Sequence, residues 1–343
     1  MRVMELGLTS FAETHPDPVS GEALSHGERL RNVIAEIEMA EEVGLDVYGL
    51  GEHHRVDMAA SAPAITLAAA AARTERIRLS SAVIVLSSAD PVRTFQDFAT
   101  LDLISAGRAE LMVGRGSFIE SFPLFGYSLN DYDELFTEKL DLLLALRDSE
   151  RVMWSGRFRA TLDDRPVYPR PQQDPLPVWI AVGGTPASIV RAGRLGLPVA
   201  LAIIGGDPAR FSVLADLYRR TLVDSGHDPE AVPLAVHGLG YIGDTNEGAA
   251  EEIYPSFSAA MTRLGEERGW PPMTRDQFDW MRSSEGSLVV GDPETVAAKI
   301  VRWKENLGIS RFMLHQAGSV PHDKALRSIE MLGTKVAPMV NKG

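Results

Sequence analysis

The sequence of 343 residues contains no cysteine. This absence excludes a disulfide framework, a zinc site with thiolate ligands and a cysteine nucleophile, and it fits the reducing cytoplasm. The first ten residues lack the basic stretch and the long apolar run of a signal peptide. The most apolar segment, residues 198–204, is far too short to span a membrane. We therefore expect a cytoplasmic protein with no membrane association.

Positive charge is also scarce, because 34 lysine and arginine residues stand against 47 aspartate and glutamate residues, a formal net charge of −13. A surface that binds DNA or RNA needs the opposite sign, so nucleic acid is not an expected partner. The negative total leaves a small anionic ligand open, because one helix N-terminus and one arginine can hold a phosphate locally. With 45% hydrophobic residues, the chain can form a large core.

The sequence does contain a repeating unit of helix, glycine and strand. In the first copy, Ser25 and Glu28 form a capping box, apolar residues follow at helical spacing, and Gly44 ends the helix before a short strand. Three further copies open with a capping residue followed by proline at the first helical position, at Asp90, Thr185 and Asp292. Strands that alternate with helices in this way predict a parallel sheet.

Eight strands are predicted, and their number favours a single-domain α/β fold over residues 1–343, a (β/α)₈ TIM barrel with insertions. The predicted strands cover residues 3–10, 45–51, 77–86, 109–114, 178–182, 198–203, 234–242 and 310–315. A Rossmann-like sheet with an extra lobe is the alternative. Residues 151–176 are predicted to form a hairpin-like insertion. Residues 266–288 are predicted to form a long loop of the kind that serves as a lid.

A candidate phosphate site lies between a predicted strand and a predicted helix, at Gly183, Gly184, Thr185 and Ser188. The two glycines let backbone N–H groups converge, and the helix dipole adds positive potential at the same point. The hydroxyls of Thr185 and Ser188 are available as donors. The same pattern also fits a well-capped turn that binds no ligand.

Arg115 and His53 each follow a predicted strand, so both are expected at the carboxyl mouth of the barrel. Arg115 stands between two glycines and is placed to meet an anion or an electron-rich ring, with a surface salt bridge as the alternative. Adjacent strand residues point to opposite sides, so His53 and His54 are not expected to share one metal. One imidazole there can transfer a proton near neutral pH, although a structural role is equally compatible.

Residues 238–243 match the dinucleotide fingerprint G-x-G-x-x-G, but they lie in mid-chain and the next helix begins later, at Thr245 or Asn246. We therefore expect no nucleotide there. Five other residues fall near strand ends, and packing is the simpler interpretation for each. They are His237 and His315, which are candidates for facing one cavity, and Phe11, Phe118 and Trp179, which are candidates for its apolar walls.

These residues together resemble the bacterial luciferase-like flavin-dependent monooxygenase family, also called the LLM-class flavin-dependent oxidoreductases. The resemblance runs over nearly the whole chain. It is densest in residues 51–54, 82–86, 89–93, 107–116, 177–180, 183–185, 196–198 and 291–294. Luciferase itself has larger, polar residues where Gly183 and Gly184 stand, so light emission is not implied.

The resemblance implies a set of FMN contacts and one catalytic residue. His53 resembles the active-site histidine beside the flavin ring, and Arg115 resembles the arginine that contacts the flavin or its phosphate. Gly183, Gly184 and Ser188, with Thr185 between them, resemble the phosphate-binding turn and helix start. Ala82 and Val83 fall where such barrels often have a cis peptide under the isoalloxazine. Residues 266–288 match the position of the family's mobile loop.

The implied function is that of a two-component monooxygenase, which uses reduced FMN and O2 on a small organic substrate. A separate flavin reductase would supply the FMN, because the chain shows no convincing nicotinamide site. Homodimers of this family suggest that the alanine-rich residues 59–72 lie at a subunit interface, although a helix buried inside one subunit would look the same. Three alternatives remain: a deazaflavin-dependent dehydrogenase, a metal-dependent hydrolase that uses His53 or His54 with His237 and His315, and a non-catalytic flavin-binding protein.

Overall fold

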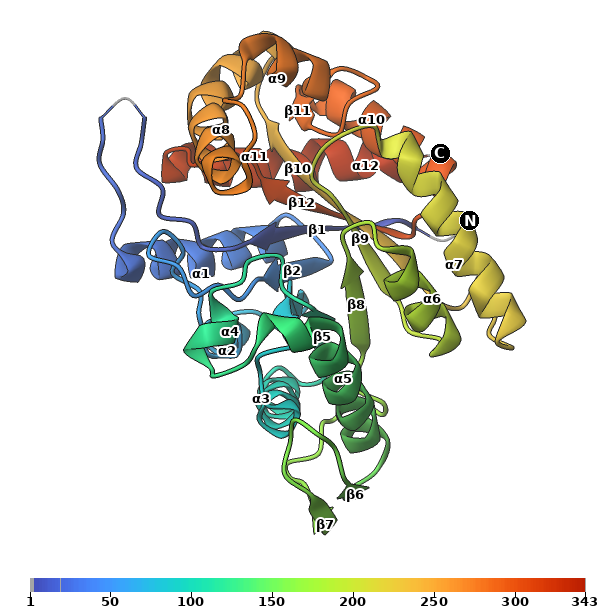
Figure 1. Cartoon of the computed structure of the whole chain (residues 1–343). Helices are drawn as coiled ribbons and strands as arrows, with labels where there is room; N and C mark the ends of the chain where they lie inside the picture. The colour runs from blue at the N-terminus through green and yellow to red at the C-terminus, as the bar shows by residue number, and fades with distance from the viewer. Residues whose placement is uncertain (1–2, 19, 343) are drawn as a thin grey trace.

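The computed structural model describes residues 3–18 and 20–342, and its centre is a closed barrel of eight parallel strands (Figure 1). The eight strands are β1 (Glu5–Ser10), β2 (Val47–Leu50), β3 (Arg78–Ser81), β5 (Ala109–Gly114), β8 (Val178–Val182), β9 (Val199–Ile203), β10 (Leu234–Ile242) and β12 (Arg311–Gln316). Each strand pairs with the next in this order, and the pairing of β12 with β1 closes the ring. The TIM-barrel prediction is confirmed, and the Rossmann-like alternative is wrong.

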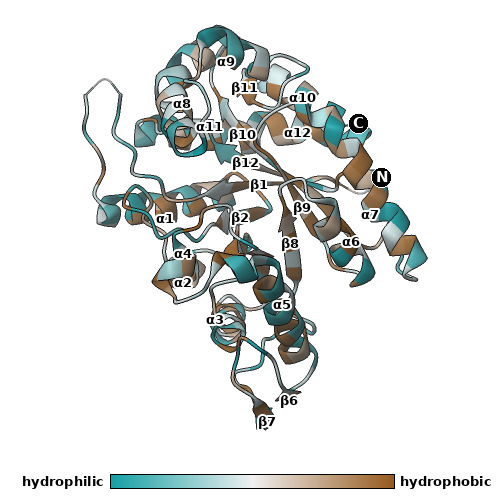
Figure 2. Ribbon diagram, viewed as in Figure 1, coloured by the Kyte–Doolittle hydropathy of each residue, from teal (hydrophilic) through white to brown (hydrophobic). Residues whose placement is uncertain are grey.

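Helices surround this barrel. They are α1 (His26–Glu42), α2 (Pro63–Ala71), α3 (Pro91–Ile104), α4 (Ser121–Leu124), α5 (Tyr132–Asp148), α6 (Pro186–Arg194), α7 (Ser212–Asp224), α8 (Asn246–Arg268), α9 (Arg275–Arg282), α10 (Pro293–Leu307), α11 (His322–Met331) and α12 (Ala337–Val340), with short turns η1 (Leu129–Asp131), η2 (Pro208–Phe211) and η3 (Leu332–Val336). Figure 2 shows hydrophobic colour along central strands such as β8 and β9, which the helices cover. Within the described part of the chain, no helix is long and apolar enough to cross a membrane.

The predicted helix starts are formed by the predicted residues. Ser25 and Glu28 make both hydrogen bonds of the capping box of α1. The side chains of Asp90 and Asp292 accept hydrogen bonds from backbone N–H groups in the first turns of α3 and α10. Thr185 differs, because its side chain makes no capping hydrogen bond to α6. The N-terminus of α6 therefore keeps donors that α1, α3 and α10 satisfy with their own capping side chains.

The barrel interior is filled in layers from its amino end. The lowest layer is a buried ion network in which Arg311 bonds Glu110 at 2.6 Å and Glu5 at 2.7 Å. The next layer is apolar, and its buried residues are Val47, Met112, Trp179, Ala200, Ala235 and Met313. The Arg311 guanidinium lies 4.3 Å from the centre of the Trp179 ring. These layers fill the lower part of the barrel, and a cavity opens above them at the carboxyl end.

The two irregular segments turn out differently. Residues 151–176 contain β6 (Arg151–Trp154) and β7 (Leu162–Pro166), an antiparallel hairpin that projects away from the barrel in Figure 1. Residues 266–288 are not one long loop, because α8 continues to Arg268 and α9 follows. A second capping box, formed by Thr274 and Gln277, starts α9, and burial of Phe278 and Met281 holds it against α8 and β10. The short strand β11 (Val289–Gly291) then pairs with β10.

Residues 238–242 of the G-x-G-x-x-G stretch lie in β10, Gly243 follows the strand, and the stretch does not open a helix. A Cβ atom at Gly240 would stand 2.3 Å from the Val289 carbonyl oxygen, so glycine there permits the close pairing of β10 with β11. α8 begins at Asn246 with Thr245 as its N-cap, as predicted. The motif therefore serves strand packing.

Candidate active site at the carboxyl end of the barrel

A cavity of about 280 Å³ opens at the carboxyl ends of the strands. Residues from distant parts of the sequence line it. Of the predicted site residues, the structure brings together His53, Ala82, Val83, Arg115, Gly183, Thr185 and Ser188 around this one cavity. Gly184 is not a wall residue but lies inside the same turn, between two residues that are.

One end of the cavity is the turn before α6. Gly184 has a φ of 121°, a conformation that favours glycine and turns the backbone into the helix. Arg115 donates a hydrogen bond from Nη2 to the Thr185 hydroxyl at 2.9 Å and another from Nη1 to Asp133 at 2.6 Å. Ser188 is buried in the first turn of α6. The arginine, two hydroxyls and the helix N-terminus form a positive pole that suits a phosphate.

A second arginine strengthens this pole, and the sequence pattern gave no sign of it. Arg191 stands on α6, one turn after Ser188. Its guanidinium lies 5.4 Å from the centre of the Phe136 ring, and burial, followed by the charge of Arg115, lowers the pKa of Arg191. A bound dianion would relieve the repulsion between the two cations.

The middle of the cavity is an apolar ledge between β3 and β4 (Ile84–Val85). The peptide bond between Ala82 and Val83 is cis, as the resemblance implied. Gly114 of β5 lets this ledge approach, because a Cβ atom there would stand 2.9 Å from a methyl carbon of Val83. Met112 and Ala181 continue the apolar surface. Such a wall suits the face of a flat aromatic ring.

His53 lies at the other end, under two aromatic rings. Its ring centre is 4.6 Å from that of Phe11 and 5.0 Å from that of Phe118. Nδ1 of His53 lies 3.8 Å from a carboxylate oxygen of Glu120. Burial raises the pKa of Glu120, but the nearby His53 imidazole, the Glu120 backbone N–H and the charge of Arg55 outweigh burial and hold that pKa below its usual value. Glu120 is thus an ionised partner for the imidazole.

His54 belongs to a different contact. Nε2 of His54 lies 2.7 Å from Glu52 Oε1, and Glu52 Oε2 accepts a hydrogen bond from the Val85 N–H. The two adjacent histidines therefore have separate carboxylate partners, although both line the same cavity. In residues 3–18 and 20–342, no group of three or more His, Asp or Glu side chains is arranged to hold a metal ion, and this includes His53 or His54 with His237 and His315.

The floor of the cavity contains His237 and Phe11. Burial, followed by the nearby charge of His315, lowers the pKa of His237 to about 3, so this ring is neutral at physiological pH. His315 itself lines a neighbouring cavity, and its ring centre is 5.3 Å from that of His237. Phe11 and Phe118 are walls, as considered from the sequence. Trp179 is not, because it belongs to the buried layer below.

Glu120 and Arg191 were missed because neither occupies a marked position. Glu120 lies in an irregular loop after β5, where no periodicity or capping pattern assigns a role. Arg191 looks in the sequence like a solvent-facing helix residue. Their one distinguishing feature in the sequence is position. Glu120 follows Arg115 by five residues, and Arg191 follows Thr185 by six.

Comparison with known proteins identifies a matching family, a relative in sequence and similar structures. A family model described as luciferase-like monooxygenase matches residues 4–311. Over 309 residues the chain is 32% identical to an F420-dependent glucose-6-phosphate dehydrogenase from Kineococcus radiotolerans, covering 81% of this chain and 85% of that protein. Monooxygenase RslO1 from Streptomyces bottropensis has a similar structure, with a TM-score of 0.84, 24% identity and coverage of 98% of this chain and 99% of that chain. The oxygenating constituent of 3,6-diketocamphane monooxygenase from Pseudomonas putida, in complex with FMN, follows with a TM-score of 0.79, 19% identity and 98% coverage of both chains.

Proposed function

Because this chain belongs to the luciferase-like monooxygenase family, we propose that it is an FMN-dependent, two-component monooxygenase. A separate reductase supplies reduced FMN, and O2 and a small organic substrate are the other reactants. One observation carries the proposal: a phosphate-type pole at Arg115 and Thr185 and an acid–base pair at His53 and Glu120 stand at opposite ends of one cavity. A flavin mononucleotide has a phosphate at one end and a reactive ring at the other.

The residues fit this cofactor. Arg115, Thr185 and Ser188 would hold the phosphate, with Arg191 adding charge and Gly183 and Gly184 leaving space. A Cβ atom built on either glycine meets nothing within 4 Å, so the turn is open above its backbone. Ala82 and Val83 would support the ring.

Bound reduced FMN supplies the electrons that activate O2. In the proposed mechanism, His53 holds or releases a proton on the ring side of the cavity, and the Glu120 carboxylate orients its imidazole. Phe11 and Phe118 cover His53 on two sides and keep water away from it. The substrate occupies the remaining apolar space near Met112 and Met313.

A second candidate is a deazaflavin-dependent dehydrogenase. The 32% identity with the F420-dependent glucose-6-phosphate dehydrogenase favours it. The same phosphate pole and the same His53–Glu120 pair serve hydride transfer as well as oxygen chemistry. The cofactor decides between the two functions.

The test is an anaerobic titration of the purified protein with reduced FMN, oxidised FMN and a reduced deazaflavin, beside Arg115→Ala. Arg93→Ala is the matched control, because the Arg93 side chain is 72% exposed on α3. We expect saturable binding of reduced FMN and a Kd raised about tenfold or more by Arg115→Ala, since a charge-assisted hydrogen bond contributes about 1.5–3 kcal/mol. Arg93→Ala should bind like the wild type.

Each other outcome has a definite meaning. Binding of the deazaflavin alone would replace the first candidate by the second. Binding of no flavin at all would overturn both. If FMN binds but the protein oxidises no organic compound in a substrate screen, it is a flavin-binding protein without this activity.

We also propose a homodimer. Ile65 on α2 is 74% exposed, and Leu103 and Ile104 at the end of the adjacent α3 are about half exposed. Ile65 lies inside the alanine-rich residues 59–72, and α3 packs against α2, so these exposed apolar side chains stand on two neighbouring helices. Ile65→Lys should convert a dimer to a monomer in sedimentation equilibrium, and an unchanged mass would contradict this interface.

A further inference from the structure

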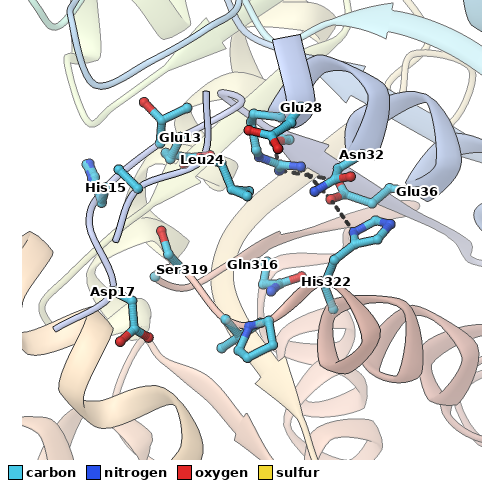
Figure 3. Close-up of a pocket in the computed structure, with 18 of the residues that line it drawn as sticks. Glu13, His15, Asp17, Leu24, Glu28, Asn32, Glu36, Gln316, Ser319 and His322 are labelled. Atoms are coloured by element: carbon cyan, nitrogen blue, oxygen red, sulfur yellow. Dashed lines mark hydrogen bonds and ion pairs between the residues drawn. The ribbon is translucent and has the colours of Figure 1, made fainter. Parts of the chain in front are cut away.

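A second cavity of about 470 Å³ lies between α1 and α11, beside the loops that follow β1 and β12. Figure 3 shows its labelled side chains: Glu13, His15 and Asp17 from the segment after β1, Leu24, Glu28, Asn32 and Glu36 from the start of α1 and the residues before it, and Gln316, Ser319 and His322 from the opposite wall. Its rim includes the exposed residues Glu22, Leu24 and Glu28, so the cavity communicates with solvent.

A short chain of hydrogen bonds joins this second cavity to the flavin cavity. Glu13 Oε1 lies 2.7 Å from Nε2 of His315, and Nδ1 of His315 lies 3.1 Å from the Thr9 hydroxyl. Glu13 and His315 line the second cavity, whereas Thr9 lines both cavities. Thr9 is 3% exposed and His315 4%, so the path between the two cavities is through protein.

Glu13, at the outer end of this chain of hydrogen bonds, is ionised and reaches the second cavity. The Glu13 side chain is 23% exposed there. Burial raises its pKa, but the charge and hydrogen bond of His315 and the charge of Arg29 outweigh burial and hold the pKa far below its usual value. The carboxylate shares a hydrogen bond with Nε2 of His315, and Nδ1 of the same ring shares one with the Thr9 hydroxyl. Acidic residues at the rim, such as Glu22 and Glu28, favour protons in this cavity.

Thr9, at the inner end of this chain of hydrogen bonds, lies at the floor of the flavin cavity, which has few other polar groups. Phe11 stands between the two proton-carrying histidines, with ring centres 4.4 Å from His315 and 4.6 Å from His53, and so keeps them apart. Nε2 of His237 is buried on this floor without a hydrogen-bond partner among the described residues. Thr9 therefore gives this floor a hydrogen-bonded connection to the second cavity.

We propose that Glu13, His315 and Thr9 form a proton relay from the second cavity to the floor of the flavin cavity. The proposal rests on the proposed function, because a flavin in the first cavity is what closes the mouth. In each passage a proton from water in the second cavity arrives at the Glu13 carboxylate and passes to Nε2 of the neutral His315 ring that carries its proton on Nδ1. That Nδ1 proton moves to the Thr9 oxygen, and the Thr9 hydroxyl gives its own proton to a base in the flavin cavity. Tautomer exchange then returns the His315 proton from Nε2 to Nδ1 before the next passage. One proton enters and one leaves, and no electrons move.

The test measures proton exchange without turnover. Reduced FMN labelled with ¹⁵N is bound anaerobically, and exchange of its ring N–H protons with solvent is followed by NMR. Thr9→Val keeps the shape of the side chain and removes the hydroxyl, whereas Thr9→Ser keeps the hydroxyl. Thr14→Val is the matched control, because Thr14 lines the second cavity only and is not part of the chain.

We expect exchange at least tenfold slower in Thr9→Val and close to the wild-type rate in Thr9→Ser and Thr14→Val. His315→Ala should also be slow, and imidazole added to the solution should restore its exchange from the second cavity. Equal rates in Thr9→Val and the wild type, with FMN bound to both, would overturn the relay and leave the proposed function intact. Failure of the wild type to bind reduced FMN would instead overturn the proposed function.

Discussion

Arg115 and Thr185 are joined by a 2.9 Å hydrogen bond between the guanidinium and the hydroxyl, although 70 residues separate them in the chain. The bond ties the end of β5 to the N-terminus of α6. It also explains why the Thr185 side chain does not cap its own helix: its oxygen faces the arginine. The first turn of α6 and the Arg115 guanidinium are therefore held together before any ligand binds.

Thr185→Val should weaken binding of reduced FMN about three- to tenfold. The substitution removes a hydrogen bond worth about 1 kcal/mol and leaves the Arg115 side chain free to move. Immobilising that side chain when the phosphate binds then costs free energy. Flavin fluorescence or calorimetry measures the Kd. Thr334→Val, at an exposed threonine on η3 that bonds the Glu330 carbonyl, is the control and should change nothing. An unchanged Kd in Thr185→Val would mean that the pole lies elsewhere.

His53→Ala should uncouple flavin oxidation from product formation. We expect the yield of product per reduced FMN to fall at least tenfold, because a positioned acid or base contributes about 10²–10⁴ in rate. Hydrogen peroxide should account for the lost product. The Kd for FMN should change less than about twofold, because that corresponds to about 0.3–0.5 kcal/mol, the amount by which independent sites typically affect each other. Glu120→Gln should give a smaller effect in the same direction. The exposed His26→Gln serves as the control. Full coupling in His53→Ala would exclude this histidine from proton transfer.

Arg311→Met should destabilise the fold by up to about 3–5 kcal/mol, because it removes the two hydrogen bonds of Arg311 and leaves the buried Glu110 carboxylate only the partly exposed Arg78. The double variant Glu110→Leu with Arg311→Met should be less destabilised than the single one, since no unpaired charge remains. Urea unfolding followed by circular dichroism measures both. Arg327→Met, which breaks an exposed pair with Glu330, should cost less than about 1 kcal/mol. A double variant less stable than Arg311→Met would contradict the charge argument.

His237 should make the folded protein less stable in acid. Burial and His315 lower its folded-state pKa to about 3, whereas an unfolded histidine titrates near 6.5. Between these values the unfolded chain binds a proton that the folded chain does not, so the free energy of unfolding falls as pH falls. Over the two units from pH 6.5 to 4.5 the loss is up to about 3 kcal/mol. His237→Leu should remove this part of the pH dependence in urea unfolding, and His26→Leu should retain it. Parallel curves for wild type and His237→Leu would contradict the shifted pKa.

The order of the strands and helices was determined by local sequence. Capping residues such as Ser25 and Asp90 satisfy N–H groups within one turn, and glycines and prolines fix backbone angles at the same short range. These effects need no partner from elsewhere, so eight strands and the helices between them could be predicted. The same logic failed at residues 266–288. There the paired prolines suggested a loop, whereas the local capping box of Thr274 and Gln277 starts a helix and burial of Phe278 stabilises it.

The sequence also indicated which loops meet at the carboxyl mouth, because every parallel strand of a barrel ends there. Their roles toward FMN stay predictions. Only the tertiary structure decided which side chains touch. Closure of the barrel sets β12 beside β1 with His315 opposite Thr9, 306 residues apart, and so creates the chain of hydrogen bonds to Glu13. Contacts of this kind depend on strand register and loop path, which no periodicity within one segment encodes.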